Sequence, residues 1–195
     1  EYPTGGRTIT VEQLLLHTSG IPSYTGQGDR WLATLRLDLD HDELLGIVRD
    51  VEFDFDPGAE YRYNNTGYYL LGMLIEQLTG QPYARVLEER IAGPLGLEDT
   101  TYCDERRIIE DRAEGYEMVE GELLNDEPLS MNQPFSAGAL CSTVVDLLAW
   151  QRALESGEVV SAESYRAMIT PGTLADGSTL EYGYGLALAG FEGRR

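Results

Sequence analysis

The chain contains no lysine: all 14 of its basic residues are arginine, against 34 aspartates and glutamates, which gives a formal charge of −20. Such a charge repels phosphate backbones and anionic lipid surfaces, so it argues against nucleic-acid binding as the function. An acid-rich, lysine-poor proteome or a salt-rich habitat would produce the same bias, and a solvated acidic surface is its simplest interpretation. We therefore infer no partner from the charge.

Cysteine and histidine are also scarce, with two residues of each kind. Cys103 and Cys141 form no C-x-x-C motif, and His17 and His41 form no H-E-x-x-H motif. These spacings suggest neither a metal site nor a redox motif, and no cofactor is expected. We expect both cysteines to be free and buried.

The chain has no apolar run that approaches the ~20 residues of a membrane helix. No charged-then-apolar leader follows Glu1, which leaves the localisation open. A length of 195 residues suffices for one well-cored domain, and no repeat, low-complexity tract or linker divides it. We expect residues 1–195 to form a single domain or a large part of one.

Hydrophobic periodicity predicts a mainly helical chain with few strands. Apolar residues recur at helical spacing in several segments, and Glu120-Gly121 has the composition of a hairpin turn between short strands within residues 115–124. Residues 67–79 are apolar on nearly every face and predict a central, buried helix. The predicted helices are residues 10–17, 40–51, 67–79, a helix from Pro82 to its end at Gly93-Pro94, 143–154 and 161–169.

Residues 182–188 differ in kind, because large and small side chains alternate along them. This period of two predicts a strand. A strand needs neighbours for its backbone groups, and the rest of the chain supplies only the weak hairpin, so a sheet is missing. We expect the exposed edge of this strand either to pair with a second copy of the chain or to be poorly ordered.

The strongest chemical signal lies just before the helix predicted at residues 67–79. Tyr63 and Asn65 stand two residues apart at its start, where both side chains can face one cleft. A tyrosine can relay protons, but a phenol with a pKa near ~10 normally needs a neighbouring cation, usually lysine. The alternative is that residues 63–66 form only a helix N-cap, where asparagine and threonine are common.

Three further stretches accompany this one and give it a context. They are residues 14–22 (LLLHTSGIP), residues 94–97 (PLGL) with Asp99-Thr100, and residues 137–143 (AGALCST) with Asp146-Leu147. In this order and spacing they resemble the β-lactamase-related serine hydrolases, which include class C β-lactamases, penicillin-binding DD-peptidases and esterases. The resemblance implies an α+β, helix-rich fold of which this chain holds the helical portion, one small hairpin and a C-terminal strand, with most of the sheet missing.

The resemblance also implies a mechanism and a division of the active site. In this family the nucleophile is the serine of an S-x-x-K motif, a Y-x-N tyrosine relays protons, and an H-x-G or K-T-G strand completes the substrate wall. Tyr63 and Asn65 match Y-x-N, whereas S-x-x-K is impossible without lysine. The family's order places S-x-x-K before Glu1 and the third motif after Arg195.

We therefore expect this chain to be the central part of a serine hydrolase, inactive by itself. In the intact parent, an ester, amide or β-lactam substrate would form an acyl-enzyme; the substrate partner would be a small molecule or a peptide. Tyr63 would pass the proton between nucleophile and leaving group, and Asn65 would orient the substrate or the lysine. The alternative is a non-catalytic module that keeps the fold's cleft as a ligand or partner surface.

Two other polar positions invite a catalytic interpretation that we do not favour. His17 stands at the end of a predicted helix beside Thr18 and Ser19, which suits a hydrogen-bonded residue better than a general base. Ser136 precedes Ala137-Gly138 without a lysine or a second histidine nearby, which suits a tight backbone approach better than a nucleophile.

Overall fold

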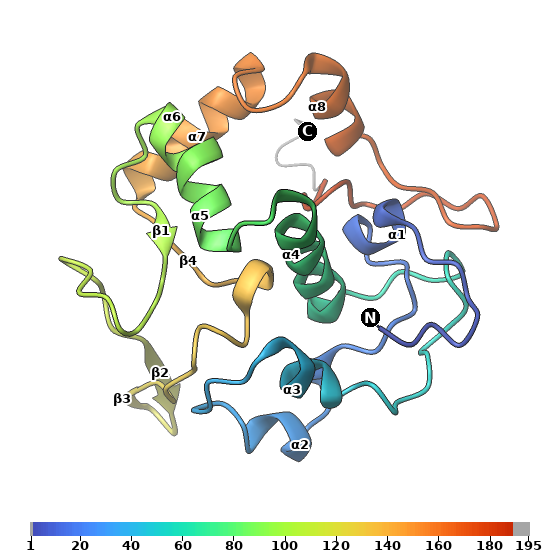
Figure 1. Cartoon of the computed structure of the whole chain (residues 1–195), viewed down its shortest axis with the longest axis horizontal. Coiled ribbons are helices and arrows are strands. Elements are labelled where there is room, and N and C mark those ends of the chain that lie inside the picture. The colour runs from blue at the N-terminus through green and yellow to red at the C-terminus, as the bar shows by residue number, and fades with distance from the viewer. Residues whose placement is uncertain (1, 189–195) are drawn as a thin grey trace.

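The computed structural model describes residues 2–188, in which helices predominate and the strands are short (Figure 1). The α-helices are α1 (Val11–Leu15), α2 (Asp29–Leu32), α3 (His41–Gly46), α4 (Asn65–Thr79), α5 (Tyr83–Leu87), α6 (Gly93–Leu95), α7 (Val144–Ser156) and α8 (Ala162–Met168). Short 3₁₀ turns η1 (Tyr24–Gly26) and η3 (Phe135–Ala137) and a π-helical turn η2 (Glu88–Ala92) join them. The strands are β1 (Thr101–Tyr102), β2 (Tyr116–Val119), β3 (Glu122–Asn125) and β4 (Leu140–Cys141).

Helix α4 occupies the centre of the molecule, with α5, α6 and α7 on one side and α2 and α3 on the other (Figure 1). Tyr69 of α4 is 1% exposed and belongs to a core cluster with α3, η1 and η3. The helix is less buried than its sequence suggests, because only Thr66, Gly67, Tyr69 and Gly72 are buried and Leu78 is 77% exposed. The core of the described residues thus covers one face of α4.

Each predicted helix is present, and the bounds differ from those predicted most clearly in two of them. Helix α3 begins with the capping box of Asp40 and Glu43 but ends at Gly46, because residues 47–51 continue as tight turns with hydrogen bonds between residues three apart. The helix predicted to end at Gly93-Pro94 instead continues through η2 and α6. Pro94 lies within the first two residues of α6, directly after the π-helical turn.

The predicted hairpin is confirmed as β2 and β3, joined by Glu120 and Gly121. Both turn residues have positive φ, 51° and 91°, as a two-residue hairpin turn requires. A second antiparallel pair, β1 with β4, was not expected, and it aligns Thr101 with Cys141 and Tyr102 with Leu140. Strands of two residues carry too little periodicity to be recognised in a sequence.

The strand predicted at residues 182–188 does not form among the described residues. Tyr182 and Ala187 make an isolated antiparallel bridge, and the Gly183 N–H donates to the Leu186 carbonyl at 2.8 Å. The segment therefore turns back on itself, which the positive φ of Gly185 (74°) permits. The expected self-association through this segment stays a prediction, because the structure is that of a single copy.

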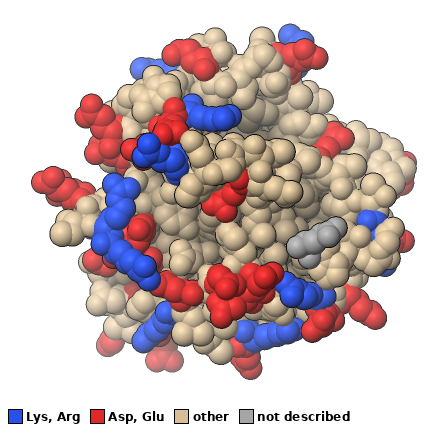
Figure 2. Space-filling model, viewed as in Figure 1, with Lys and Arg blue, Asp and Glu red and all other residues tan. Residues whose placement is uncertain are grey.

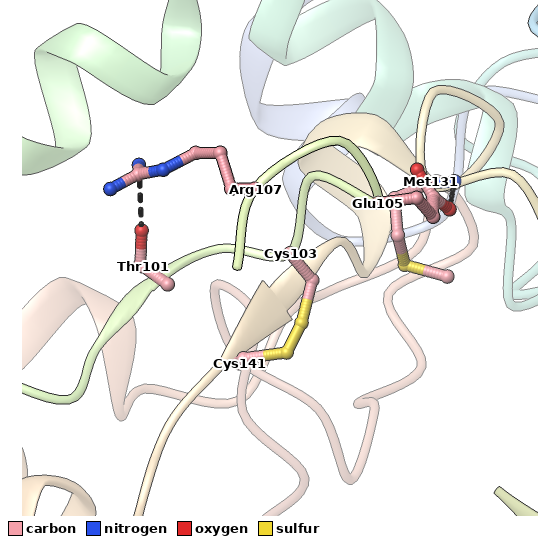
Figure 3. Close-up of a disulfide and its surroundings, with 6 residues drawn as sticks. All are labelled: Thr101, Cys103, Glu105, Arg107, Met131 and Cys141. Carbon is pink, nitrogen blue, oxygen red and sulfur yellow. Dashed lines mark hydrogen bonds between the residues drawn. A yellow bond between two sulfur atoms is a disulfide. The ribbon is translucent and has the colours of Figure 1, made fainter. Parts of the chain in front are cut away.

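The expectation of free cysteines is wrong. Cys103 and Cys141 form a disulfide (Figure 3), with Cα atoms 5.4 Å apart, and Cys103 is buried whereas Cys141 is half-buried. The pairing follows from β1 and β4, since the Cys103 N–H also donates to the Ala139 carbonyl at 2.9 Å. The contact joins residues 38 positions apart, so no local spacing signals it.

Candidate functional site

Buried and accessible side chains alternate at the start of α4. Asn64 and Thr66 are 4% and 0% exposed, whereas Tyr63 is 58% exposed and Asn65 is half-buried. The chain is extended at Asn64 (φ −145°, ψ 110°), so successive side chains point to opposite sides. The two residues of the Y-x-N motif therefore share the accessible side, and their neighbours face the core.

The N-cap of α4 is Asn64 and not Asn65. Its Oδ1 accepts from the Gly67 N–H at 2.6 Å, and its Nδ2 donates to the Ile21 carbonyl. Thr66 adds a second anchor, because its hydroxyl donates to the Pro22 carbonyl and accepts from the Tyr24 N–H, both at 2.9 Å. Asn64 and Thr66 thus meet the structural demands of the helix start.

Asn65 is oriented by two hydroxyl groups at η1, those of Ser23 at its N-cap and Thr25 within it. Its backbone N–H donates to Ser23 Oγ at 3.2 Å, and its Nδ2 donates to Thr25 Oγ1 at 3.1 Å. The two hydroxyls also share a hydrogen bond of 3.0 Å. Because the amide nitrogen of Asn65 is engaged, its Oδ1 is the group left to accept from a donor at the site. Ser23 and Thr25 were not predicted, since they lie some forty positions from Asn65.

Tyr63 packs against His17, with ring centroids 4.4 Å apart. The His17 ring also contacts Tyr68 at 4.8 Å and Tyr182 at 5.1 Å, so that α1, α4 and the C-terminal segment meet at this imidazole. Burial raises the pKa of both Tyr68 and Tyr182 above the ordinary value of 10. These phenols therefore stay neutral at physiological pH and give the His17 ring polar but uncharged neighbours.

His17 is a hydrogen-bonded residue at the end of α1, as its sequence context predicted. It is 2% exposed, its Nδ1 accepts from the Asn64 N–H at 3.1 Å, and its Nε2 lies 3.2 Å from the Tyr182 hydroxyl. Burial lowers the pKa of His17 from 6.5 to about 4. The ring is therefore neutral at physiological pH, with both nitrogens engaged.

The two remaining motifs of the resemblance have structural roles. The buried carboxylate of Asp146 accepts from the Asp99 N–H at 2.9 Å and from the Thr100 hydroxyl at 2.8 Å, so the 99–100 and 142–147 stretches hold each other. This turns α7 so that Val144 and Val145 are 81% and 72% exposed. The buried residues of α7 are Asp146, Ala153 and Leu154, so its inner face is only partly apolar.

Ser136 is not placed as a nucleophile. Its hydroxyl donates to the Tyr68 carbonyl at 2.8 Å, and its side chain lies so close to Gly72 that a methyl group added there would overlap Ser136 Oγ. This is the close approach that the small residues of the 136–138 turn predicted, with α4 as the other partner.

Two hollows lie elsewhere on the molecule. A cavity of about 1200 Å³ is bounded by α5, α6 and residues 107–113 and 140–143, and one of about 670 Å³ lies between α1, Pro57-Gly58 and residues 170–175. Tyr63 and Asn65 line neither. They lie instead on an open face of the described residues.

Within residues 2–188, no cluster of three or more His, Cys, Asp or Glu side chains could hold a metal ion, and no helix is long and apolar enough to span a membrane. Acidic side chains are spread over the face in Figure 2 with arginines among them, and several form exposed pairs such as Arg36 with Glu127 at 2.7 Å. Such exposed pairs contribute little to stability.

Comparison with known proteins identifies the relatives of the chain. The family model described as Beta-lactamase matches residues 1–194. PbpX of Bacillus subtilis, described as a penicillin-binding protein, is 31% identical over 94% of the chain and 44% of its own length. A D-aminopeptidase of Gluconobacter oxydans is 29% identical over 72% of the chain and 26% of its own length.

Solved structures agree with this assignment. A D-stereospecific amidohydrolase from a Streptomyces species superposes with a TM-score of 0.77 at 32% identity, over 91% of this chain and 56% of that one. The chain thus spans 44% of PbpX and little more than half of this solved relative. The fold of the helix-rich domain matches the fold implied by the sequence motifs.

Proposed function

The chain belongs to the Beta-lactamase family, and we propose that it is the central part of a serine hydrolase that works through an acyl-enzyme. The observation that carries the proposal is the division of labour at the start of α4. Asn64 and Thr66 cap and anchor the helix, which leaves Tyr63 and Asn65 on the accessible side without a structural duty at the cap. The N-cap alternative explains Asn64 and Thr66 but not their neighbours.

In the proposed reaction the serine of an S-x-x-K motif outside this chain attacks the substrate carbonyl. Tyr63 carries the proton from that hydroxyl to the leaving group, and water later releases the acyl group by the reverse transfer. Asn65 offers its Oδ1 to a donor, either a substrate N–H or the ammonium of the lysine. Because the chain has no lysine, the 195-residue chain is itself inactive.

The substrate class we propose first is the amide of a D-amino acid. Two of the similar proteins are described as a D-aminopeptidase and a D-stereospecific amidohydrolase. An amide is also a substrate whose N–H can donate to Asn65 Oδ1. Hydrolysis of D-phenylalanine amide but not of the L-isomer by the intact parent would support this choice, and equal rates for both would contradict it.

Covalent labelling tests the mechanism. A fluorophosphonate or fluorescent penicillin should label the intact parent protein at its S-x-x-K serine and should not label the 195-residue chain. Tyr63→Phe should lower the acylation rate about 10²- to 10⁴-fold, the usual contribution of a proton-relaying group. Tyr116→Phe is the matched control, since Tyr116 lies on β2 with the same 58% exposure.

Three outcomes would count against the proposal. Labelling of the 195-residue chain would show that its nucleophile is present after all. An intact parent without S-x-x-K, or one that binds the probe reversibly and unaffected by Tyr63→Phe, would favour the alternative of a non-catalytic binding module.

A further inference from the structure

His17 holds the backbone on both sides of Tyr63. Its carbonyl accepts from the Arg62 N–H at 3.0 Å, and its Nδ1 accepts from the Asn64 N–H at 3.1 Å. Its ring lies against the phenol between those two contacts, with centroids 4.4 Å apart and planes inclined by 40°. His17 therefore contacts the side chain of Tyr63 and also the backbone N–H groups of the residues before and after Tyr63.

The backbone of His17 is in an uncommon conformation that makes these contacts compatible. Its φ is +57°, a value that few non-glycine residues adopt. Such a conformation persists where the surroundings over-determine it, and it is often found at functional sites. Here the surroundings include the Thr18 carbonyl, which accepts from the Gly58 N–H at 2.7 Å and so ties the same turn to the segment leading to Tyr63.

The hydrogen bonds also fix the tautomer of the ring. A backbone N–H can only donate, so Nδ1 of His17 must be unprotonated. A neutral imidazole then carries its proton on Nε2, which donates to the Tyr182 hydroxyl at 3.2 Å. Four phenol rings lie in contact with the His17 ring, those of Tyr61, Tyr63, Tyr68 and Tyr182.

We infer that His17 is a positioning residue for Tyr63. In its neutral Nε2–H form, His17 holds the Tyr63 phenol in place through the two backbone contacts and the ring contact. The inference rests on the proposed function, in which Tyr63 relays protons. His17 itself does not act as a base, because both nitrogens are engaged and its side chain is buried.

Nuclear magnetic resonance tests the tautomer without any activity. In the 195-residue chain labelled with ¹⁵N-histidine, His17 should show a protonated Nε2 and an unprotonated Nδ1 at pH 7. The chain has only two histidines, so a His17→Asn difference spectrum assigns the signals; the same difference spectrum of the intact parent replaces it where the shorter chain does not fold. An Nδ1–H tautomer or an imidazolium at pH 7 would overturn the inference.

Two variants separate the hydrogen bond from the backbone conformation. His17→Asn places an acceptor close to the position of Nδ1 and tolerates positive φ, whereas His17→Gly tolerates positive φ without an acceptor. In the intact parent, His17→Gly should lower kcat at least tenfold with KM changed less than threefold, and His17→Asn should recover much of the loss. Equal kcat values for both variants and the unmodified parent would overturn the inference.

His41 supplies a matched control, since it too is hydrogen-bonded at both nitrogens, to the Tyr69 hydroxyl at 2.7 Å and to Glu76 at 3.2 Å. His41→Asn should lower the melting temperature but leave kcat unchanged. A loss of kcat as large as that of His17→Gly would reduce His17 to a structural residue. Failure of the proposed function is recognised separately, because Tyr63→Phe would then leave kcat unchanged whatever tautomer His17 adopts.

Discussion

At the start of α4, two adjacent asparagines have opposite roles, and mutation should separate them. Asn64→Ala removes the N-cap and leaves the buried Ile21 carbonyl without its donor, which should lower the free energy of unfolding by about 2–3 kcal/mol. Asn65→Ala loses one half-buried hydrogen bond to Thr25 and should cost under about 1 kcal/mol. Urea unfolding measures both, and a larger loss for Asn65→Ala would contradict the assigned roles.

His17 should make stability depend on pH in a defined window. Its pKa is lowered by burial from 6.5 to about 4, so below pH 6.5 the unfolded chain binds a proton that the folded chain does not. The free energy of unfolding is therefore not reduced by His17 above pH 6.5. As the pH falls towards 4, it decreases by on the order of 3 kcal/mol. Burial raises the pKa of Tyr61, Tyr68 and Tyr182 around the ring, so these three phenols stay neutral throughout this window.

The comparison of His17→Asn with the unmodified chain isolates this effect from the titration of the many carboxylates. The free energy of unfolding, measured in urea, should decrease less between pH 7 and pH 4.5 in the variant than in the unmodified chain. Identical pH dependence in the two proteins would show that His17 does not titrate as its burial implies.

Among the elements, the packing of η3 on α4 depends on one glycine. A methyl group at Gly72 would overlap Ser136 Oγ and lie 2.7 Å from Phe135 Cε1, so Gly72→Ala should destabilise by about 1–3 kcal/mol through overpacking. Gly46 in α3 meets nothing within 4 Å, and Gly46→Ala should instead stabilise by up to about 1 kcal/mol. Thermal unfolding of the two variants should thus shift in opposite directions.

The sequence predicts features that depend on interactions between neighbouring residues better than features that depend on contacts between distant segments. The helix starts predicted near residues 10 and 40 and the turn at Glu120-Gly121 depend on local sequence, and the structure confirms them. The burial of Asp146, the disulfide and the turn at residues 182–188 depend on contacts between distant segments, and the sequence did not reveal them. Tyr63 and Asn65 were found by motif, whereas their partners Ser23, Thr25 and His17 became partners only in the folded chain.

At the scale of the whole molecule, the strongly negative charge opposes self-association of the chain, whereas an exposed apolar helix favours it. A charge of −20 keeps copies apart, while Val144, Val145, Leu147 and Leu148 of α7 are each about half exposed or more. Association through residues 182–188 stays a prediction for light scattering at increasing chain concentration, with a concentration-independent monomer as the contrary result. Association that disappears in Val145→Asp would assign the contact to α7 instead.

The disulfide should be the largest single covalent contribution to the stability of this domain. It closes a loop of 38 residues that carries the exposed β2–β3 hairpin, and in the chain-entropy model such a loop is worth about 4 kcal/mol. Reduction, or the double variant Cys103→Ser with Cys141→Ser, should therefore lower the unfolding midpoint markedly, and the variant should no longer respond to dithiothreitol. Mass spectrometry of the non-reduced digest should recover the peptides of Cys103 and Cys141 joined, and two free thiols in the folded protein would contradict the pairing.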